Sequence, residues 1–134
     1  MWHFKRFITR WWPTVAVTCA ILYLTLTSHP PKPDGIKLFE GADKVVHFLM
    51  MAGLTATAIF DRYRAKLHTG RTTIAVIALW VMAFGALTEL MQETLTQARS
   101  GDISDMAADW AGTLTAAAIA MTTRIRHAHK KTRL

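Results

Sequence analysis

The sequence predicts an all-α membrane protein with four transmembrane helices and both termini in the cytoplasm. The first observation is that 51% of the 134 residues are hydrophobic and that they form long, nearly uninterrupted runs. The second is that the charged residues, 16 Lys+Arg and 9 Asp+Glu, fall in clumps between those runs. A soluble domain would instead alternate charged and apolar residues at helical or strand spacing. The third is that the positive clumps occupy alternate connections, which predicts an orientation.

Four apolar runs are the expected transmembrane helices of one domain that covers the whole chain, residues 1–134. The second run has His47 as its only ionisable residue, and the third is free of charge until Glu89. Each run has about the 17–20 residues that a helix needs to cross a ~30 Å hydrocarbon core. A backbone in lipid must satisfy its own hydrogen bonds, so these runs should be helices. They span residues 12–27, 45–60, 72–90 and 106–123.

The connections between the runs are short and polar. The first, 28–43, contains Pro30, Pro31 and Pro33, which should end the first helix and impose an extended path. We expect basic and polar loops at 61–71 and 93–104. The N-terminus is basic and then apolar, as a signal peptide is, but it lacks a good cleavage signal and is expected to be a retained helix.

The charges predict which side each connection faces. Twelve of the 16 basic residues lie in the N-terminal segment, in the connection after the second run and in the C-terminal tail: Lys5, Arg6, Arg10, Arg62, Arg64, Lys66, Arg71, Arg124, Arg126, Lys130, Lys131 and Arg133. Of the acidic residues, only Asp61 accompanies them. The positive-inside rule therefore places both termini in the cytoplasm. Topology and anionic headgroups explain the basic excess, and we expect no nucleic-acid partner.

Polar residues gather at the expected outer ends of the second, third and fourth runs. Asp43 and His47 are four residues apart and share one helix face, as do Asp105 and Asp109. An ionisable group inside a span costs about 2.5–3.5 kcal/mol on insertion scales, so it usually faces the bundle interior and has a partner. The candidate cluster comprises Asp43, Lys44, His47, Glu89, Gln92, Arg99, Asp105, Asp109 and Gly112.

These residues also have purely structural interpretations. Asp43 could cap the second helix, and Glu89–Arg99 or Asp43–His47 could be internal ion pairs. Small residues repeat every four positions in the fourth run, a pattern that allows close helix packing, with a homodimer interface as the alternative use. The repeat comprises Ala108, Gly112, Ala116 and Ala120.

Several kinds of chemistry are not indicated. The lone Cys19 excludes an internal disulfide framework and a cysteine-rich metal site. We find no serine or cysteine nucleophile with a base at suitable spacing, no phosphate-binding glycine loop and no cofactor motif. The sequence therefore assigns no catalytic residue.

Across residues 12–123 the chain resembles the VanZ-like family of small bacterial membrane proteins. The family's first motif, D-K-x-x-H-F, is matched by Asp43, Lys44, His47 and Phe48, and its second, E-x-x-Q, by Glu89 and Gln92. A third motif is matched by Arg99, Asp105, Asp109 and Gly112. Two positions depart from the pattern: Asp109 replaces the usual Asn, which adds a negative charge, and Met51 replaces a frequent Tyr.

The resemblance implies a protein of the bacterial cytoplasmic membrane that is associated with tolerance to glycopeptide antibiotics, teicoplanin above all. It attaches no biochemical activity to the fold. The first functional hypothesis is that the outward-facing cluster binds or modifies an envelope lipid or a lipid-linked cell-wall intermediate. Arg99 would hold a phosphate or carboxylate, and His47, oriented by Asp43, would act as acid or base beside Glu89.

The metal variant of this hypothesis uses the same cluster to hold a divalent cation, either an oxygen-preferring one (Mg, Mn or Ca) or Zn. Its candidate ligands are Asp43, His47, Glu89, Asp105 and Asp109. The second hypothesis is a small proton-coupled transporter that uses Glu89. The third is a non-catalytic envelope scaffold in which the cluster is structural.

Overall fold

Four α-helices make up almost all of the chain that the computed structural model describes, which is residues 2–27, 41–95 and 103–132. The helices are α1 (Trp2–Leu26), α2 (Ala42–Arg64), α3 (Arg71–Leu95) and α4 (Ile103–Thr132). The prediction of an all-α chain with four helices is therefore confirmed. α1 begins earlier than its predicted apolar run, and the other three helices extend past their runs at both ends. The flanking residues continue the helical hydrogen bonding.

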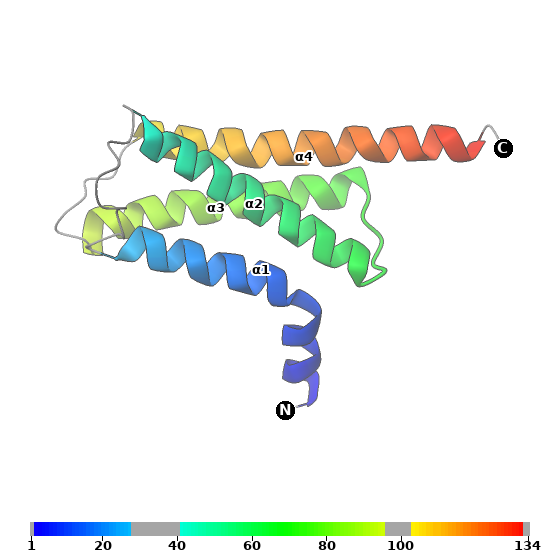
Figure 1. The fold of residues 1–134 in the computed structure, drawn as a ribbon, viewed down its shortest axis with the longest axis horizontal. Helices are drawn as coiled ribbons and strands as arrows, with labels where there is room; N and C mark the ends of the chain where they lie inside the picture. The colour runs from blue at the N-terminus through cyan, green and yellow to red at the C-terminus, as the bar shows by residue number, and fades with distance from the viewer. Residues whose placement is uncertain (1, 28–40, 96–102, 133–134) are drawn as a thin grey trace.

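The helices run alternately in opposite directions along one bundle (Figure 1). α2 contacts all three other helices, and its contact with α4 is the most extensive, whereas α1 packs on α2 and α3. One end of the bundle, here called the acidic end, contains Asp43, Glu89 and Asp105. The opposite end, the basic end, contains Arg64 and Arg71. The described turn between α2 and α3, residues 65–70, is shorter than the predicted loop.

Some predicted features lie outside the described residues. They include the proline-rich connection through residue 40, and Arg99 in the connection between α3 and α4. Side-chain placement is described for residues 10–27, 41–95 and 103–124.

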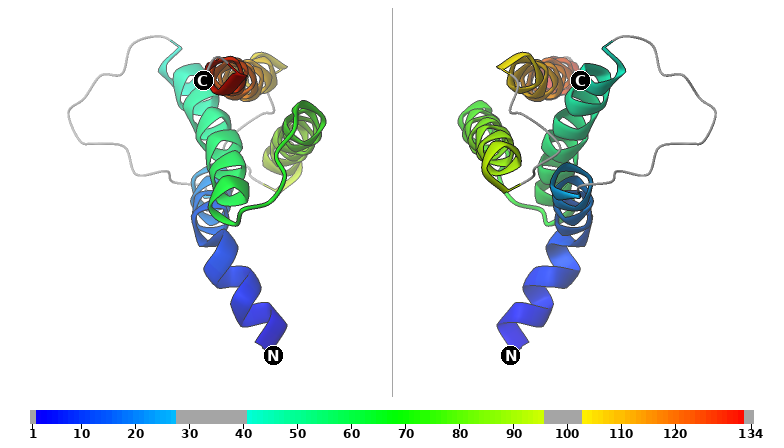
Figure 2. Two further views of the ribbon diagram at one scale, coloured as in Figure 1. Left: turned by 90° about the vertical axis from the view of Figure 1, so that its right-hand side faces the viewer. Right: turned by 90° about the vertical axis from the view of Figure 1, so that its left-hand side faces the viewer.

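α1 bends sharply in its N-terminal half, so that its first turns leave the bundle (Figures 1 and 2). This half contains Pro13. Proline has no amide hydrogen, and its ring clashes with the carbonyl four residues earlier, so it bends a helix in the interior. The bend lies at the basic end, beside the end of α2.

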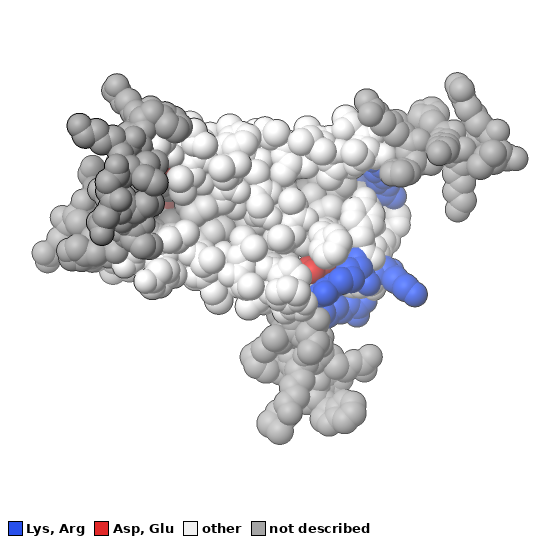
Figure 3. Space-filling model, viewed as in Figure 1, with Lys and Arg blue, Asp and Glu red and all other residues white. Residues whose placement is uncertain are grey.

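The bundle has an apolar exterior, and its interior combines apolar core residues such as Met51 and Ile74 with buried polar ones. Trp80 and Leu79 are 73% and 66% exposed, whereas His47, Asp61 and Asp109 are buried. Figure 3 shows a broad band of uncharged side chains along the bundle, with Lys and Arg gathered at one end of it. This is the reverse of a water-soluble domain, which rarely exposes large contiguous apolar surface.

Threonine contributes much of the buried polarity without leaving unpaired hydroxyls. Thr25, Thr55 and Thr113 donate their hydroxyls to the carbonyls of Ile21, Met51 and Asp109, each four residues earlier, at 2.8, 2.8 and 3.0 Å. Each hydroxyl is thus satisfied within its own helix, as is typical of threonine in apolar surroundings.

Two of the described helices, α2 and α3, are long and apolar enough to cross a membrane by length and composition alone. Their best segments have mean hydropathies of 1.3 and 2.1. Only 33% of each segment is buried in the bundle. A core helix of a soluble protein would be mostly buried, so the exposure of these two segments favours association with a membrane.

Candidate functional site

His47 of α2 is the centre of a buried polar cluster at the acidic end. Its Nδ1 lies 3.0 Å from Oδ1 of Asp109, and its Nε2 lies 3.8 Å from Oδ2 of Asp105. Both carboxylates belong to the first turns of α4, four residues apart, so they project from one helix face. The imidazole therefore lies between two carboxylates of a neighbouring helix, with 4% of its side chain exposed.

Gly112 allows α4 to approach α2 closely enough for this contact. A Cβ added to Gly112 would lie 2.9 Å from the carbonyl carbon of Phe48 and closer still to its oxygen. The neighbour is backbone, so it cannot rotate away. Phe48 follows His47, and Gly112 lies one turn after Asp109, so this close approach sets the distance between imidazole and carboxylate.

α3 closes the other side of Asp109. A Cβ on Gly85 would lie 3.1 Å from Oδ2 of Asp109, so the absence of a side chain there makes room for the carboxylate. Among the described residues Oδ2 has no hydrogen-bond partner, although the side chain is almost fully buried. Trp110 of α4 also contacts α3, since its Nε1 donates to the Met82 carbonyl at 3.3 Å.

Asp43 and Lys44 form the rim of the cluster. Lys44 Nζ lies 3.7 Å from Oδ2 of Asp43 and 3.5 Å from Oδ1 of Asp105. The Asp43 side chain is 44% exposed. The expectation that Asp43 orients His47 thus differs from the geometry, in which Asp109 does so. A shared helix face does not ensure contact, whereas the close approach of α4 brings its carboxylate directly to the ring.

Glu89 and Gln92 of α3 have different surroundings: Glu89 lies near His47, and Gln92 contacts α1. Glu89 is buried, interacts electrostatically with His47, and lines a cavity of about 220 Å³ together with Glu93 and Met106. Gln92 donates from Nε2 to the Thr25 carbonyl at 2.9 Å. It therefore satisfies one of the last carbonyls of α1, which have no partner within their own helix.

The described residues do not form a ready metal site. In the described ranges no three His, Cys, Asp or Glu side chains come together as ligands would. At the rim, the Lys44 ammonium lies close to both Asp43 and Asp105 and compensates part of their charge. The candidate ligands His47, Asp105 and Asp109 lie near one another, and their closest contacts are with one another and with Lys44.

An apolar groove begins beside the cluster and runs between α2 and α4. Its cavity has a volume of about 600 Å³, within the usual range for ligand pockets. Phe48 and Leu49 line its beginning, next to His47, and Tyr63 lines its far end. Gly53 also lines it, and a Cβ there would meet nothing within 4 Å. The intervening walls are mostly alanine and isoleucine.

The sequence reasoning missed Asp61, which is fully buried at the basic end. Its Oδ2 accepts hydrogen bonds from the Thr14 amide at 3.1 Å and the Thr14 hydroxyl at 2.7 Å. One signal could have indicated this role: Asp61 is the single acidic residue among the basic connections, and Pro13 precedes Thr14.

Comparison with known proteins adds no relative, since no family model, curated protein or solved structure matches the chain. The class is therefore defined by the fold and the site alone. It is a small all-helical protein with an apolar exterior, two helices able to cross a membrane, and a buried histidine between two aspartates.

Proposed function

We propose that the chain is a four-span protein of the bacterial cytoplasmic membrane, with both termini in the cytoplasm and the acidic end outside. The uncharged band along the bundle supports this arrangement, as does the exposed apolar surface of the helices. α1 and α4 are less apolar, but each is long enough to cross, at about 1.5 Å per residue. The basic excess at the opposite end gives the orientation.

We further propose that the chain is a VanZ-like protein and that it binds, and through His47 acts on, an envelope lipid or a lipid-linked cell-wall intermediate. The observation that carries the proposal is that a histidine between two carboxylates directly precedes Phe48, the first α2 residue that lines the apolar groove between α2 and α4. A polar cluster and an apolar groove that are neighbours along α2 suit an amphiphile, which has a polar head and a hydrocarbon chain.

The dimensions of the groove suit an acyl or isoprenoid chain. From Phe48 to Tyr63 the groove follows about 22 Å of helix at 1.5 Å per residue. One leaflet of a bilayer is about half of a ~30 Å hydrocarbon core. A chain lying in the groove could therefore extend from the headgroup level past the middle of the membrane.

The cluster supplies the chemistry that a polar head requires. Lys44, which is 42% exposed, offers an ammonium to a phosphate. Asp109 fixes the ring of His47 by accepting from Nδ1–H, which leaves Nε2 to accept a proton from a nucleophile. Asp105, near Nε2, would stabilise the imidazolium that forms. In the complete chain Arg99 is the additional candidate for gripping the phosphate.

Two substitutions at one position test the groove. Gly53→Phe should fill the groove, whereas Gly53→Ala should leave it open and the fold unchanged, because nothing lies within 4 Å of that Cβ. We expect protein extracted from membranes to carry a lipid with Gly53→Ala and to lose it with Gly53→Phe, as measured by mass spectrometry of the intact complex. Equal lipid content in the two variants would refute the groove as the binding site.

Substitutions in the cluster separate binding from a structural role. We expect His47→Ala to fold, to retain lipid in the groove, and to lose the antibiotic-tolerance phenotype in cells. If His47→Ala and Glu89→Gln both fold and retain full tolerance, the cluster has no functional role. The scaffold hypothesis would gain if both variants failed to fold, and the transporter hypothesis if Glu89→Gln alone abolished proton-dependent substrate movement in proteoliposomes.

A further inference from the structure

The bend of α1 is held by the end of α2. In a regular helix the Thr14 amide would donate to the carbonyl of Arg10. Here the Thr14 amide donates to Asp61 at 3.1 Å, and the Arg10 carbonyl accepts from Nη2 of Arg64 at 2.8 Å. Asp61 and Arg64 are three residues apart on α2 and form an ion pair at 3.5 Å. Asp61 and Arg64 of α2 thus form hydrogen bonds with the two α1 backbone groups, the Thr14 amide and the Arg10 carbonyl, that would pair with each other in a regular helix.

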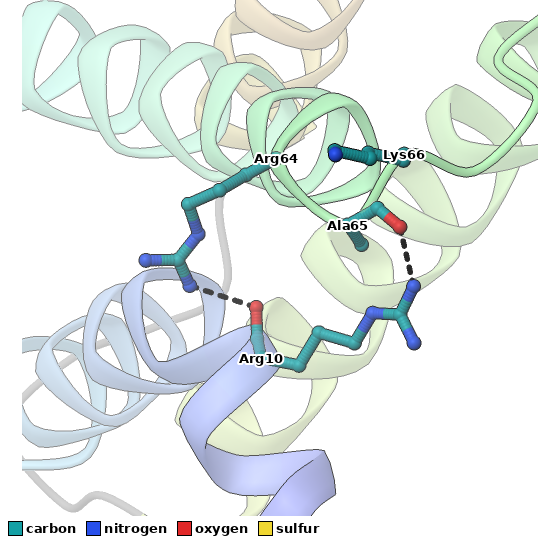
Figure 4. Close-up of a pocket in the computed structure, with 4 residues that line it drawn as sticks. All are labelled: Arg10, Arg64, Ala65 and Lys66. Carbon is teal, nitrogen blue, oxygen red and sulfur yellow. Dashed lines mark hydrogen bonds between the residues drawn. The ribbon is translucent and has the colours of Figure 1, made fainter.

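The same contact fixes two guanidinium groups. Arg10 donates from Nη2 to the carbonyl of Ala65, just after the end of α2, while Arg64 donates back to the Arg10 carbonyl (Figure 4). Each arginine is therefore anchored to the backbone of the other segment. Anchored cations lose less side-chain entropy when they bind a ligand.

Lys66 is placed at this junction by a strained turn. The Leu67 amide donates to the Arg62 carbonyl at 3.0 Å, and the Lys66 amide donates to the Tyr63 carbonyl at 2.9 Å. This is the Schellman termination of a helix, in which the residue in the left-handed conformation is usually glycine. Lys66 adopts a φ of 55°, the one positive φ of a non-glycine residue in the described ranges. Strain of this kind at a surface site calls for a functional explanation.

A cavity of about 360 Å³ lies among these groups and is lined by Arg10, Arg64, Ala65 and Lys66. Three of the four lining residues are cations. The nearby carboxylate of Asp61 is fully buried and engaged with Thr14, so it does not neutralise all three. A positively charged cavity with two guanidinium groups is suited to a phosphate, which guanidinium recognises through paired hydrogen bonds.

We infer that this cavity binds the phosphate group of an anionic membrane lipid. The cavity is lined by residues of α1 and of the end of α2. α1 leaves the bundle at that end (Figure 1), and Lys and Arg gather at the same end of the uncharged band (Figure 3). Trp12, which is 55% exposed, lies beside the cavity, with the Arg64 guanidinium 6.0 Å from its ring. Aromatic and basic side chains together mark the headgroup level of a membrane, and basic pockets between helices there bind anionic headgroups. The cavity shares no lining residue with the groove between α2 and α4, so the inference goes beyond the function proposed for that groove.

Lys66 provides the sharpest test. Lys66→Gly removes a cation and also relieves the strained φ, so it should raise the midpoint of thermal unfolding while weakening lipid binding. Lys66→Gln removes the charge but keeps the strain. In detergent we expect phosphatidylglycerol to raise the unfolding midpoint of the unchanged protein more than phosphatidylcholine does. Both variants should reduce the apparent affinity for phosphatidylglycerol tenfold or more.

Arg71→Gln is the matched control, because Arg71 is an exposed cation at the same end that does not line the cavity. Its affinity should stay within twofold of the unchanged protein. An equal loss in Arg71→Gln and Lys66→Gly would show that general charge attracts the lipid and would overturn the inference, as would undiminished affinity in both Lys66 variants.

Two further measurements test whether the bound phosphate belongs to a lipid and whether the lipid binds in the cavity. Inorganic phosphate at millimolar concentration should stabilise weakly, and equal protection by inorganic phosphate and phosphatidylglycerol would overturn the lipid assignment. The Gly53→Phe variant should keep its response to phosphatidylglycerol, because the added side chain fills only the groove between α2 and α4 and not the cavity. Loss of that response would place the lipid in the groove and refute the cavity as its site.

Discussion

Replacement of Gly112 by alanine should separate α2 from α4 and break the His47–Asp109 contact. The added Cβ would lie 2.9 Å from the carbonyl carbon of Phe48 and 3.1 Å from its Cα, whereas ordinary contacts begin near 3.4 Å. The helices must therefore move apart by at least about 0.5 Å. Because the Phe48 oxygen lies closer still, the His47–Asp109 distance would grow from 3.0 Å to at least about 3.5 Å, beyond the usual range of such hydrogen bonds.

The expected free-energy cost follows from these two effects. Overpacking a well-packed interface costs about 1–3 kcal/mol, and the loss of a buried hydrogen bond to a charged group costs about 1.5–3 kcal/mol. Alanine regains up to about 1 kcal/mol through its better helix propensity. The net loss should therefore be about 2–5 kcal/mol in the free energy of unfolding.

Two other glycines of the same bundle make the assay internally controlled. At Gly53 a Cβ meets nothing within 4 Å, and at Gly85 it meets the side chain of Asp109 at 3.1 Å. Unfolding in detergent should rank the three alanine variants with Gly53 most stable, Gly85 intermediate and Gly112 least stable. If Gly112→Ala unfolds at the same midpoint as Gly53→Ala, the close approach of α2 and α4 does not hold the cluster together.

Three further predictions concern the two polar networks. Asp109→Asn should fold and lose only about 1–2 kcal/mol, because an amide oxygen still accepts from His47 without the charge; unfolding midpoints equal to those of Asp109→Ala would contradict this. Asp61→Ala should cost about 3–5 kcal/mol in unfolding experiments, since it removes a fully buried carboxylate and leaves the partly buried Thr14 amide and hydroxyl without their acceptor; a loss below 1 kcal/mol would argue against the anchor. Pro13→Ala should restore a regular α1 and lower the stabilisation of the protein by phosphatidylglycerol. An unchanged response to the lipid would show that the cavity does not need the bend.

The fold could be read from the sequence because long apolar runs have few alternatives to helix. Three of the four predicted runs lie wholly within an observed helix, and the first, 12–27, runs one residue past the end of α1 at Leu26; the observed helices are 23–30 residues long. The ends were less predictable. Residues such as Arg62 and Arg64 continue α2, since a charged side chain at a helix end can leave the apolar band and still keep its backbone hydrogen bonds.

The composition of the acidic-end site could be predicted, but not its pairing. Helical spacing brought His47 and the two aspartates of α4 to one region of the bundle. It could not show that Asp109 contacts the ring, because that contact depends on how closely two helices pack. That distance depends on Gly112 meeting the backbone of Phe48, and on Gly85 making room for the carboxylate.

The sequence by itself determined the helical class of this protein, its apolar exterior and the separation of charge between its two ends, since each depends on local runs of residues. The tertiary structure alone decided which polar groups are partners. It paired His47 with Asp109, turned Gln92 toward α1, and placed Asp61 beneath the bend at Pro13. The physical reason is that partners 47 to 67 residues apart in the chain meet only through the packing of whole helices, which no local pattern encodes.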